Sequence, residues 1–457
     1  MLRKTLIIFT LGFLTLSAFF IRLENFKRGE MRGIDEIVYY RMGAQVSRDI
    51  SDYNTIPYGK ELAAGGRELP PYFFEPLFKH PPFFTFFVAL FIKIFGNSLL
   101  SAEYVALLFG VLTIPLVYLL ANKLYGWQAG LLSAIIFSFD PMSVICSQKV
   151  WMETTVAFFT VLSVYFFIRA LKDKDQNQFI LSGAASGFAA LNKYNGTLPT
   201  VAFVVYALLF DRALFRNKKF ILGLIMPVLM LLPWFAWNWA VYGQHSLAMQ
   251  GELHAGKPHE AQMLRNAAAF ALLGLSGFLL ARKVKKDFIK SKLVIRVSVA
   301  VVCLALFWPN ILLSLQLTHL PVTSWAGAAF YGSPPTFYAD RLLEFSSIYL
   351  IVFFAYLIPL KETTASERVL LMSPLVVLVF FSIWAGYQSR YIAAAIPFLV
   401  VIAGAWLWRV YAKGEELPFG WERLLLRACV LFILIFSLAK MQIINLYVSY
   451  PNDMCYF

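Results

Sequence analysis

Apolar segments about as long as a bilayer-spanning helix recur along almost the whole chain. A transmembrane helix needs roughly 20 predominantly apolar residues. Segments of this kind follow one another after residue 100, with no long polar stretch between them. Only 14% of the residues are charged, against about 25% in ordinary soluble domains. The pattern predicts an all-α polytopic membrane protein and excludes a soluble globular enzyme, a disordered chain and a coiled coil.

The charges of the connections predict the orientation in the membrane. Arg3 and Lys4 place the N-terminus in the cytoplasm, because cytoplasmic loops are enriched in Lys and Arg. The first span is 5–21, and 81–95 is too short to cross, so we expect it to be interfacial or re-entrant. The basic residues then fall mostly in cytoplasmic loops, which also explains the net charge of +14 without a nucleic acid partner. We therefore predict about thirteen helices, the later twelve at 100–121, 127–146, 154–170, 179–192, 197–210, 220–241, 266–281, 293–317, 343–360, 369–385, 391–410 and 424–446.

The longest connections lie on the opposite face of the predicted bundle. They are the first loop, 22–99, which we expect to contain interfacial helices, and the loops 242–265 and 318–342. Since the cytoplasmic connections are short and basic, we expect the function on the extracytoplasmic face. We expect one membrane domain over 1–457, in a plasma or inner membrane.

Two adjacent acids, Asp35 and Glu36, come a few residues after the first span. Tyr39 and Tyr40 follow at the spacing that shares one side of a helix with them. The acids are candidates for catalysis and the tyrosines for substrate contact. The alternative is that both acids only complement the N-terminal dipole of a helix.

A second candidate site is the motif that contains Glu75 and Lys79-His80-Pro81-Pro82. The two prolines mark a rigid entry into the following segment. A cation beside a helix N-terminus is well suited to hold a lipid phosphate. The alternative for Lys79 is that its side chain extends to the membrane interface.

The third set lies around the next outer connection. Lys149 and Glu153 are four residues apart and can pair with each other. Asp140, inside the predicted span 127–146, is a functional candidate because a carboxylate is costly within a membrane.

Isolated cations at the outer ends of later spans complete the candidates. Lys193, and Arg390 followed by Tyr391, can each pair with an acid, hold a phosphate or anchor a helix. The scattered histidines and cysteines have no zinc spacing. No phosphate-binding loop, dinucleotide fingerprint or HExxH motif occurs, which disfavours a nucleotide-driven motor and a zinc protease.

In this order the motifs resemble those of the GT-C integral-membrane glycosyltransferases. The nearest branch is similar to protein O-mannosyltransferases and to the lipid A aminoarabinose transferase. The resemblance is best over 1–200 and rests on Asp35-Glu36-x-x-Tyr39, His80-Pro81-Pro82-Phe83, Asp140-Pro141, Lys149 with Glu153, Asn192-Lys193-Tyr194, Pro233-Trp234 and Arg390-Tyr391.

The resemblance implies a hexosyl or pentosyl transferase that takes its sugar from a polyprenyl or dolichyl phosphate. The acceptor would be a hydroxyl of a protein, lipid or glycan at the outer leaflet, in contact with membrane lipids. The family's catalytic carboxylate carries over to Asp35, with Glu36 beside it, and its second acid to Glu153. The family's phosphate-binding cations match Lys79, His80 and Arg390, to which we add Tyr391 and Lys193 as donor-binding residues. Tyr39, Tyr40, Glu75, Asp140 and Lys149 are the expected substrate contacts.

This leads to a hypothesis of single displacement with inversion, in which Asp35 is the general base. Cations would neutralise the leaving phosphate. The acid pair can also recruit a divalent cation, but nothing in the sequence requires one. The alternative function is a transporter or lipid flippase, which usually shows inverted repeats and charges near the membrane midplane. The sequence shows neither.

Overall fold

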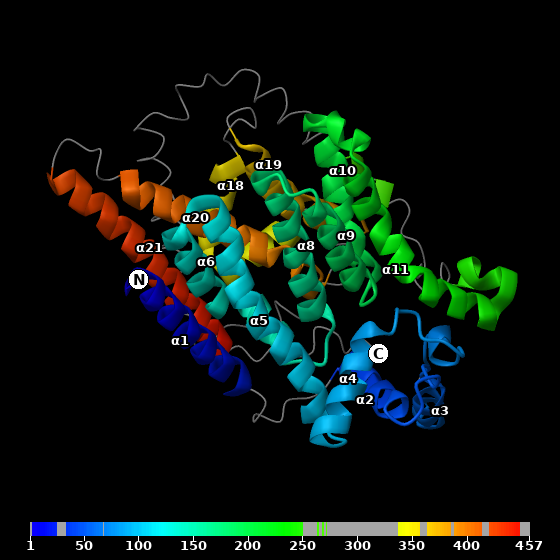
Figure 1. Ribbon diagram of the computed structural model, residues 1–457. Helices are drawn as coiled ribbons and strands as arrows, with labels where there is room; N and C mark the ends of the chain where they lie inside the picture. Colours follow the sequence, from blue (N-terminus) through cyan, green and yellow to red (C-terminus); the bar gives the residue numbers. More distant parts are fainter. Residues whose placement is uncertain are drawn as a thin grey trace. The chain divides into compact units, whose positions relative to one another are not determined.

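The computed structural model describes residues 2–24, 33–66, 68–249, 263, 264, 267, 268, 271, 337–356, 363–384, 388–413 and 420–447. Within these residues all regular structure is helical (Figure 1). The predicted spans 266–281 and 293–317 lie almost entirely outside the described residues. The same holds for most of the outer loops 242–265 and 318–342.

The chain forms two compact units. The first unit comprises Met1–Ala18, Ile114–Val144 and Glu260–Tyr450, and the second comprises Phe19–Thr113, Ile145–His259 and Pro451–Phe457. Two long helices, α1 (Leu2–Glu24) and α5 (Leu99–Tyr125), contribute residues to both units.

The second unit contains most of the candidate residues. In it α8 (Glu153–Asp173) packs against α9 (Asn177–Ala190), and α9 packs against α11 (Lys218–Tyr242) (Figure 1). Its other helices are α2 (Ile34–Val46), α3 (Ile56–Ala64), α4 (Phe83–Phe95) and α10 (Leu198–Phe210), with short 3-10 helices η2 (Pro71–Phe73), η3 (Tyr194–Thr197), η4 (Arg212–Arg216) and η5 (Gly243–His245).

The sequence explains where several of these helices begin and end. The Asn217 side chain accepts hydrogen bonds from the backbone N–H groups of Lys219 and Phe220, at 2.9 and 3.4 Å, and so caps the start of α11. Helix α4 starts directly after Pro82 and stops at Gly96, whose φ of 91° disfavours any other residue. Its 13 residues are too few to span a bilayer, as expected for 81–95.

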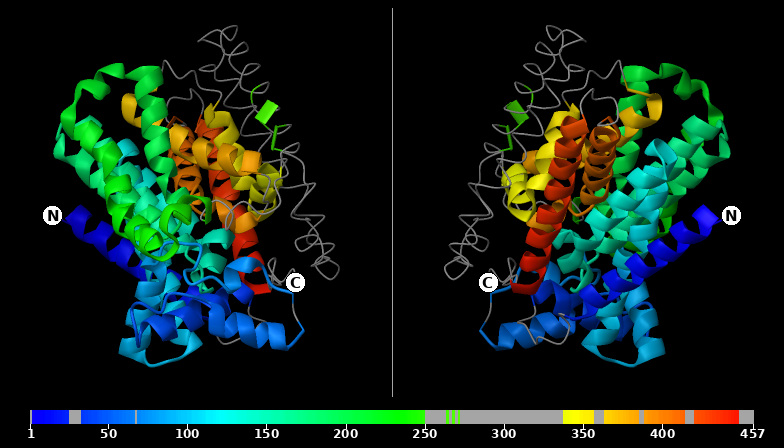
Figure 2. Two further views of the ribbon diagram at one scale, coloured as in Figure 1. Left: turned by 90° about the vertical axis from the view of Figure 1, so that its right-hand side faces the viewer. Right: turned by 90° about the vertical axis from the view of Figure 1, so that its left-hand side faces the viewer.

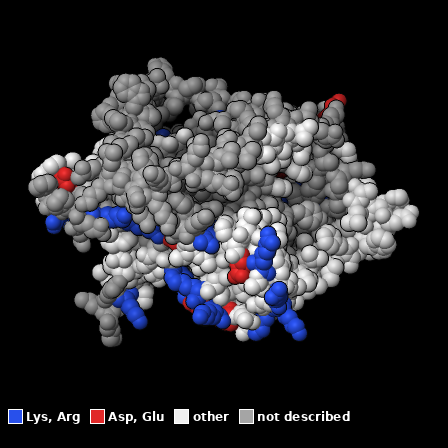
Figure 3. All heavy atoms as spheres, turned by 90° about the horizontal axis from the view of Figure 1, so that it is seen from above, with Lys and Arg blue, Asp and Glu red and all other residues white. Residues whose placement is uncertain are grey.

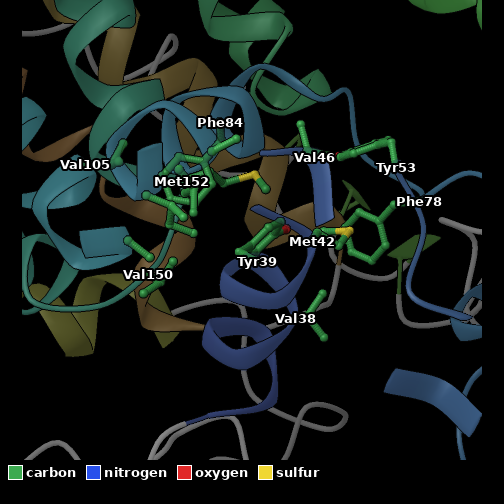
Figure 4. Close-up of a cluster of buried hydrophobic side chains, with 14 of the residues drawn as sticks. Val38, Tyr39, Met42, Val46, Tyr53, Phe78, Phe84, Val105, Val150 and Met152 are labelled. Atoms are coloured by element: carbon green, nitrogen blue, oxygen red, sulfur yellow. The ribbon is translucent and has the colours of Figure 1, made fainter. Parts of the chain in front are cut away.

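An apolar core joins α2 and α4 to the other helices of the second unit. Val38, Met42 and Val46 of α2 pack in one buried cluster with Phe84 of α4 and residues of other segments (Figure 4). Val150 and Met152 belong to the same cluster. The segment 147–153, which we call the 147–153 connection, is therefore anchored in the same core as α2.

The first unit is built around α20 (Ile396–Lys413). This helix packs against α6 (Trp127–Phe139), α18 (Leu350–Tyr356), α19 (Ala365–Trp384) and α21 (Gly420–Tyr447). In Figure 2, α19, α20 and α21 run from orange to red along the chain. Its other elements are α17 (Phe337–Phe345), the 3-10 helices η6 (Ser347–Tyr349) and η8 (Ser389–Ile392), and the start of α7 (Pro141–Ser147).

The described helices are those of a multi-pass membrane protein. Seven are long and apolar enough to cross a membrane, or eight if the bent pair α6 and α7 forms one span. In α1, large apolar side chains such as Ile8 and Phe9 are more than 70% exposed, as expected for lipid contact. Among the described side chains visible in Figure 3, the charged ones are mostly Lys and Arg. The predicted number of thirteen helices remains a prediction.

Candidate functional site

Asp35 and Glu36 lie in the first turn of α2, as both interpretations of the sequence expect. Glu36 is fully buried, and its Oε2 accepts a hydrogen bond of 3.0 Å from the backbone N–H of Gly33. Asp35 is only partly buried. The two neighbouring acids therefore have different environments: Glu36 caps its own helix, whereas Asp35 reaches the surface.

Glu36 also connects α2 to the 147–153 connection. The Nζ atom of Lys149 lies 3.8 Å from Glu36 Oε2, and the backbone N–H of Val150 donates to Glu36 Oε1 at 3.4 Å. Both side chains of this ion pair are buried, with 6% and 0% exposure. A buried carboxylate is stable when it is paired and hydrogen-bonded, and Glu36 meets both conditions.

A second ion pair lies at the other end of the 147–153 connection. Glu153 opens α8, and its Oε1 accepts a hydrogen bond of 3.1 Å from Lys193 Nζ. Lys193 lies between α9 and η3, forty residues along the chain. The structure thus joins Lys149 and Glu153 each to a distant partner, whereas their spacing pointed to a pair with each other.

The motif with His80, Pro81 and Pro82 lies beside the loop that carries Lys193. The backbone N–H of Phe83 donates to the carbonyl of Leu191 at 3.2 Å. The Tyr53 hydroxyl donates to the carbonyl of His80 at 2.9 Å. Burial raises the pKa of Tyr53 well above its usual value, so that its phenol remains a neutral donor.

The side chains near this motif are mostly aromatic. Lys79 Nζ lies 4.0 Å from the centre of the Tyr72 ring, a cation–π contact. The imidazole of His80 packs edge-on against Phe78, with ring centres 5.7 Å apart. Glu75 is half-buried and interacts with the Tyr242 hydroxyl.

Tyr39 and Tyr40 differ in burial, as Glu36 and Asp35 do. The Tyr39 ring is 6% exposed and lies edge-on to Phe84, at 5.4 Å, within the apolar core (Figure 4). Tyr40 is half-buried at the margin of that core. The packing gives Tyr39 a structural role, and its predicted contact with substrate stays a prediction.

Asp140 belongs to the first unit, at the break between α6 and α7, which are bent by 58°. Its Oδ1 accepts the backbone N–H of Ser143 at 2.7 Å, and its Oδ2 accepts the hydroxyl of Tyr349 at 2.5 Å. Both oxygens of this fully buried carboxylate therefore have donors. These bonds stabilise a break in a helix, which is a structural role for an acid predicted to contact substrate.

Arg390 and Tyr391 also belong to the first unit, in η8. Arg390 is 7% exposed, and its Nε donates to Gln388 Oε1 at 2.9 Å. The Tyr391 ring stacks on Phe381 at 5.1 Å. The cation is thus held firmly, and its predicted binding to a phosphate remains a prediction.

The buried cation Arg22 was not singled out from the sequence. Arg22, near the end of α1, is fully buried and donates from Nε to Ser147 Oγ at 3.3 Å. Placed just after an apolar span, it has the pattern of an ordinary interface anchor. Arg22 is buried against the 147–153 connection, which is distant in the sequence. No pattern of residues near Arg22 in the sequence indicates this contact.

The described residues contain no group of three or more His, Cys, Asp and Glu side chains that could hold a metal ion. Glu36 and Glu153 each form an ion pair with a lysine.

Comparison with known proteins connects this geometry to glycosyltransferases. Residues 79–237, less than half of the chain, match the model of the dolichyl-phosphate-mannose-protein mannosyltransferase family. An uncharacterized protein of Aquifex aeolicus (strain VF5) is 30% identical over 192 residues. That match covers 41% of this chain and 38% of the relative, so the chain spans well under half of the relative's length.

The structural matches extend over nearly the entire chain. ArnT from Cupriavidus metallidurans, in the apo state, superposes with a TM-score of 0.60 at 15% identity, covering 99% of this chain and 78% of ArnT. The fold is that of ArnT. ArnT bound to undecaprenyl phosphate gives a TM-score of 0.58 at 16% identity, covering 98% of this chain and 77% of ArnT.

A second solved structure has the same fold. The archaeal oligosaccharyltransferase AglB from Archaeoglobus fulgidus, in complex with an inhibitory peptide and a dolichol-phosphate, gives a TM-score of 0.59 at 15% identity. The match covers 98% of this chain and 57% of AglB. The ArnT and AglB matches confirm the predicted GT-C fold, and the family match confirms the resemblance to protein mannosyltransferases within 79–237.

Proposed function

We propose that this protein transfers a sugar from a polyprenyl or dolichyl phosphate to a hydroxyl acceptor at the extracytoplasmic membrane surface. The observation that carries the proposal is the meeting of acids and cations from separate segments of the second unit. The start of α2, the 147–153 connection and the loop with Lys193 are joined by the pairs Glu36–Lys149 and Glu153–Lys193. ArnT with undecaprenyl phosphate and AglB with dolichol-phosphate support a lipid-phosphate donor.

The proposed reaction is a single displacement. The acceptor hydroxyl loses its proton to Asp35 while its oxygen bonds to the anomeric carbon of the sugar. The bond between that carbon and the phosphate oxygen breaks, the lipid phosphate leaves with the electron pair, and the configuration inverts. Asp35 is the better base because it is partly exposed, whereas Glu36 is enclosed by donors. A positioned general base typically contributes about 10²–10⁴-fold to the rate.

The departing phosphate needs positive charge beside it. We assign this role to Lys79 and His80, which precede α4 in the second unit. The resemblance adds Arg390 and Tyr391, and Lys193 with Glu153 would orient the sugar. Lys79→Gln is expected to raise the KM for the lipid donor, and a KM equal to that of the wild type would remove Lys79 from the site.

The remaining expected contacts of the second unit, Tyr40, Glu75 and Lys149, would border the acceptor, and Tyr39 would support them from the core of that unit. We propose no metal step. AglB has been crystallised with Zn and sulfate, so transfer should be measured with and without a chelator. Activity that persists in the chelator agrees with the lysine-neutralised acids of this chain.

The test is sugar transfer by the purified protein in detergent. Radiolabelled polyprenyl- and dolichyl-phosphate sugars are supplied one at a time, with membrane extract as acceptor. We expect label to leave one class of donor and to enter protein, lipid or glycan. If no donor loses its sugar, and the labelled lipid instead crosses the bilayer of reconstituted vesicles, the protein is a flippase.

A further inference from the structure

Arg22 is a charged side chain in an unusual position for the end of a transmembrane helix. It is fully buried, and its Nε donates to Ser147 Oγ at 3.3 Å. A guanidinium stays charged in proteins, and burial of a charge is costly unless it is paired and hydrogen-bonded. An arginine that only anchored α1 would extend its head group into water. The burial of Arg22 therefore indicates another role.

The partner of Arg22 is held in a narrow space. A Cβ atom on Gly110 of α5 would overlap Ser147 Oγ and lie 2.9 Å from Ser147 Cβ. Ser147 thus fits only because Gly110 has no side chain. Beside it, Gln148 Nε2 donates to the carbonyl of Ile21 at 3.5 Å, a second link to the end of α1. Arg22 and Ile21, at the end of α1, therefore both hold the start of the 147–153 connection.

The residues that follow Ser147 hold the acid of α2. Lys149 lies 3.8 Å from Glu36, and the N–H of Val150 donates to the same carboxylate. Glu36 in turn caps the first turn of α2, the turn that carries Asp35. A shift of Ser147 would move the ion-pair partner Lys149 and the donor Val150 against Glu36 and, through Glu36, the backbone of Asp35.

We propose that Arg22 is a positioning residue for sugar transfer. Through Ser147 it sets the place of Lys149 and Val150 against Glu36, and thereby the place of Asp35 relative to the substrate. The inference rests on the proposed function. Arg22 itself touches neither donor nor acceptor, so its loss should lower kcat and leave the KM for the lipid donor nearly unchanged.

The test compares transfer kinetics of Arg22→Gln, Arg22→Lys, Ser147→Ala and the double variant Arg22→Gln/Ser147→Ala. Misplacement by about 1 Å can cost about 10²-fold in rate. We therefore expect Arg22→Gln to lower kcat by about 10- to 100-fold, with donor KM within about twofold. Arg22→Lys should restore part of kcat, because an ammonium donates but lacks the planar fork of Arg. The double variant should be no slower than Arg22→Gln alone, because Ser147→Ala removes a hydrogen bond that Arg22→Gln already breaks.

Arg48→Gln is the matched control, since Arg48 is an exposed arginine of the same outer segment and should keep full kcat. If Arg22→Gln does not fold in detergent, Ser147→Ala and Arg22→Lys must still lower kcat. Full kcat in these variants, or additive losses in the double variant, would overturn the inference. So would a raised donor KM at normal kcat, which would make Arg22 a donor-binding residue. Absence of transfer by the wild type would instead overturn the proposed function itself.

Discussion

Asp35 and Glu36 show how two neighbouring carboxylates acquire different tasks. Glu36 receives donors from Gly33, Lys149 and Val150 and has no exposed surface. Asp35 is partly exposed at the start of the same helix. A carboxylate that is fully enclosed cannot meet an acceptor hydroxyl, so we propose Asp35 as the catalytic base and Glu36 as a structural residue.

Glu36→Gln should therefore lower stability as well as activity. It removes the carboxylate charge that faces the buried ammonium of Lys149, and loss of one partner of a buried ion pair typically costs about 3–5 kcal/mol. We expect a lower midpoint of thermal unfolding in detergent. Glu36→Gln/Lys149→Met removes both members of the pair and should recover part of the midpoint but not the transfer rate. Equal midpoints for Glu36→Gln and the wild type would contradict this role.

Tyr349→Phe tests the structural role of Asp140. The change removes the hydroxyl that donates to Asp140 Oδ2 and leaves that buried carboxylate partly unsatisfied, at a cost of about 1–3 kcal/mol. Tyr356→Phe is the matched control, because its hydroxyl donates only to the neutral carbonyl of Leu371. The unfolding midpoint should fall further in Tyr349→Phe, while donor KM stays unchanged. A changed KM for the lipid donor would instead support the prediction that Asp140 contacts substrate.

The sequence singles out acids and cations that the structure brings together, but it does not show which of them pair. Helical spacing favours Lys149 with Glu153, since local neighbours are the pairs that a sequence displays. In the structure Lys149 meets Glu36 and Lys193 meets Glu153, because tertiary packing brings segments together that are 40 or more residues apart. The burial of Arg22 has the same origin.

At the scale of the elements, α9 and α11 approach at two glycines. A Cβ on Gly183 would overlap the carbonyl oxygen of Gly223 and lie 2.8 Å from its Cα. Small residues permit such close approach of membrane helices. Since α9 leads directly to Leu191 and Lys193, its distance from α11 affects the site as well as the fold.

Gly183→Ala should separate these helices. Forcing a methyl group into a packed contact costs about 1–3 kcal/mol, and the unfolding midpoint should fall. Gly12→Ala is the control, because a Cβ there meets nothing within 4 Å. Ala at that helical position is expected to be neutral or stabilising by about 0.5–1 kcal/mol. Equal midpoints for the two variants would show that α9 and α11 are not in close contact.

Most described helices fall where hydropathy places them, since a long apolar run is a strong signal. Helix α5 covers the predicted span 100–121, and α4 is short, as expected of 81–95. The predicted span 127–146 is broken at Asp140, where Pro141 supplies no N–H for a continuous helix. A hydropathy average over a window of residues does not detect such a break. The bend and the hydrogen bonds of Asp140 therefore could not be predicted from hydropathy.

At the scale of the whole molecule, orientation in the membrane is the main prediction from loop charges. In a cysteine-free background, Ala63→Cys on exposed α3 should react with an impermeant maleimide in intact cells. Lys172→Cys, exposed at the end of α8, should react only after the membrane is opened. The reverse pattern would place the first outer loop, with Asp35, in the cytoplasm.

The most direct test of the central claim is transfer by Asp35→Asn beside Asp49→Asn. Asp49 is an exposed acid of the same segment, and hydrogen bonds from the side chain and backbone of Ser51 hold its pKa below the usual value. Both variants should unfold at the wild-type midpoint. We expect Asp35→Asn to lose about 10²–10⁴-fold in the rate of label leaving the lipid donor, as loss of a general base does. Asp49→Asn should keep the wild-type rate, and full transfer by Asp35→Asn would contradict the account.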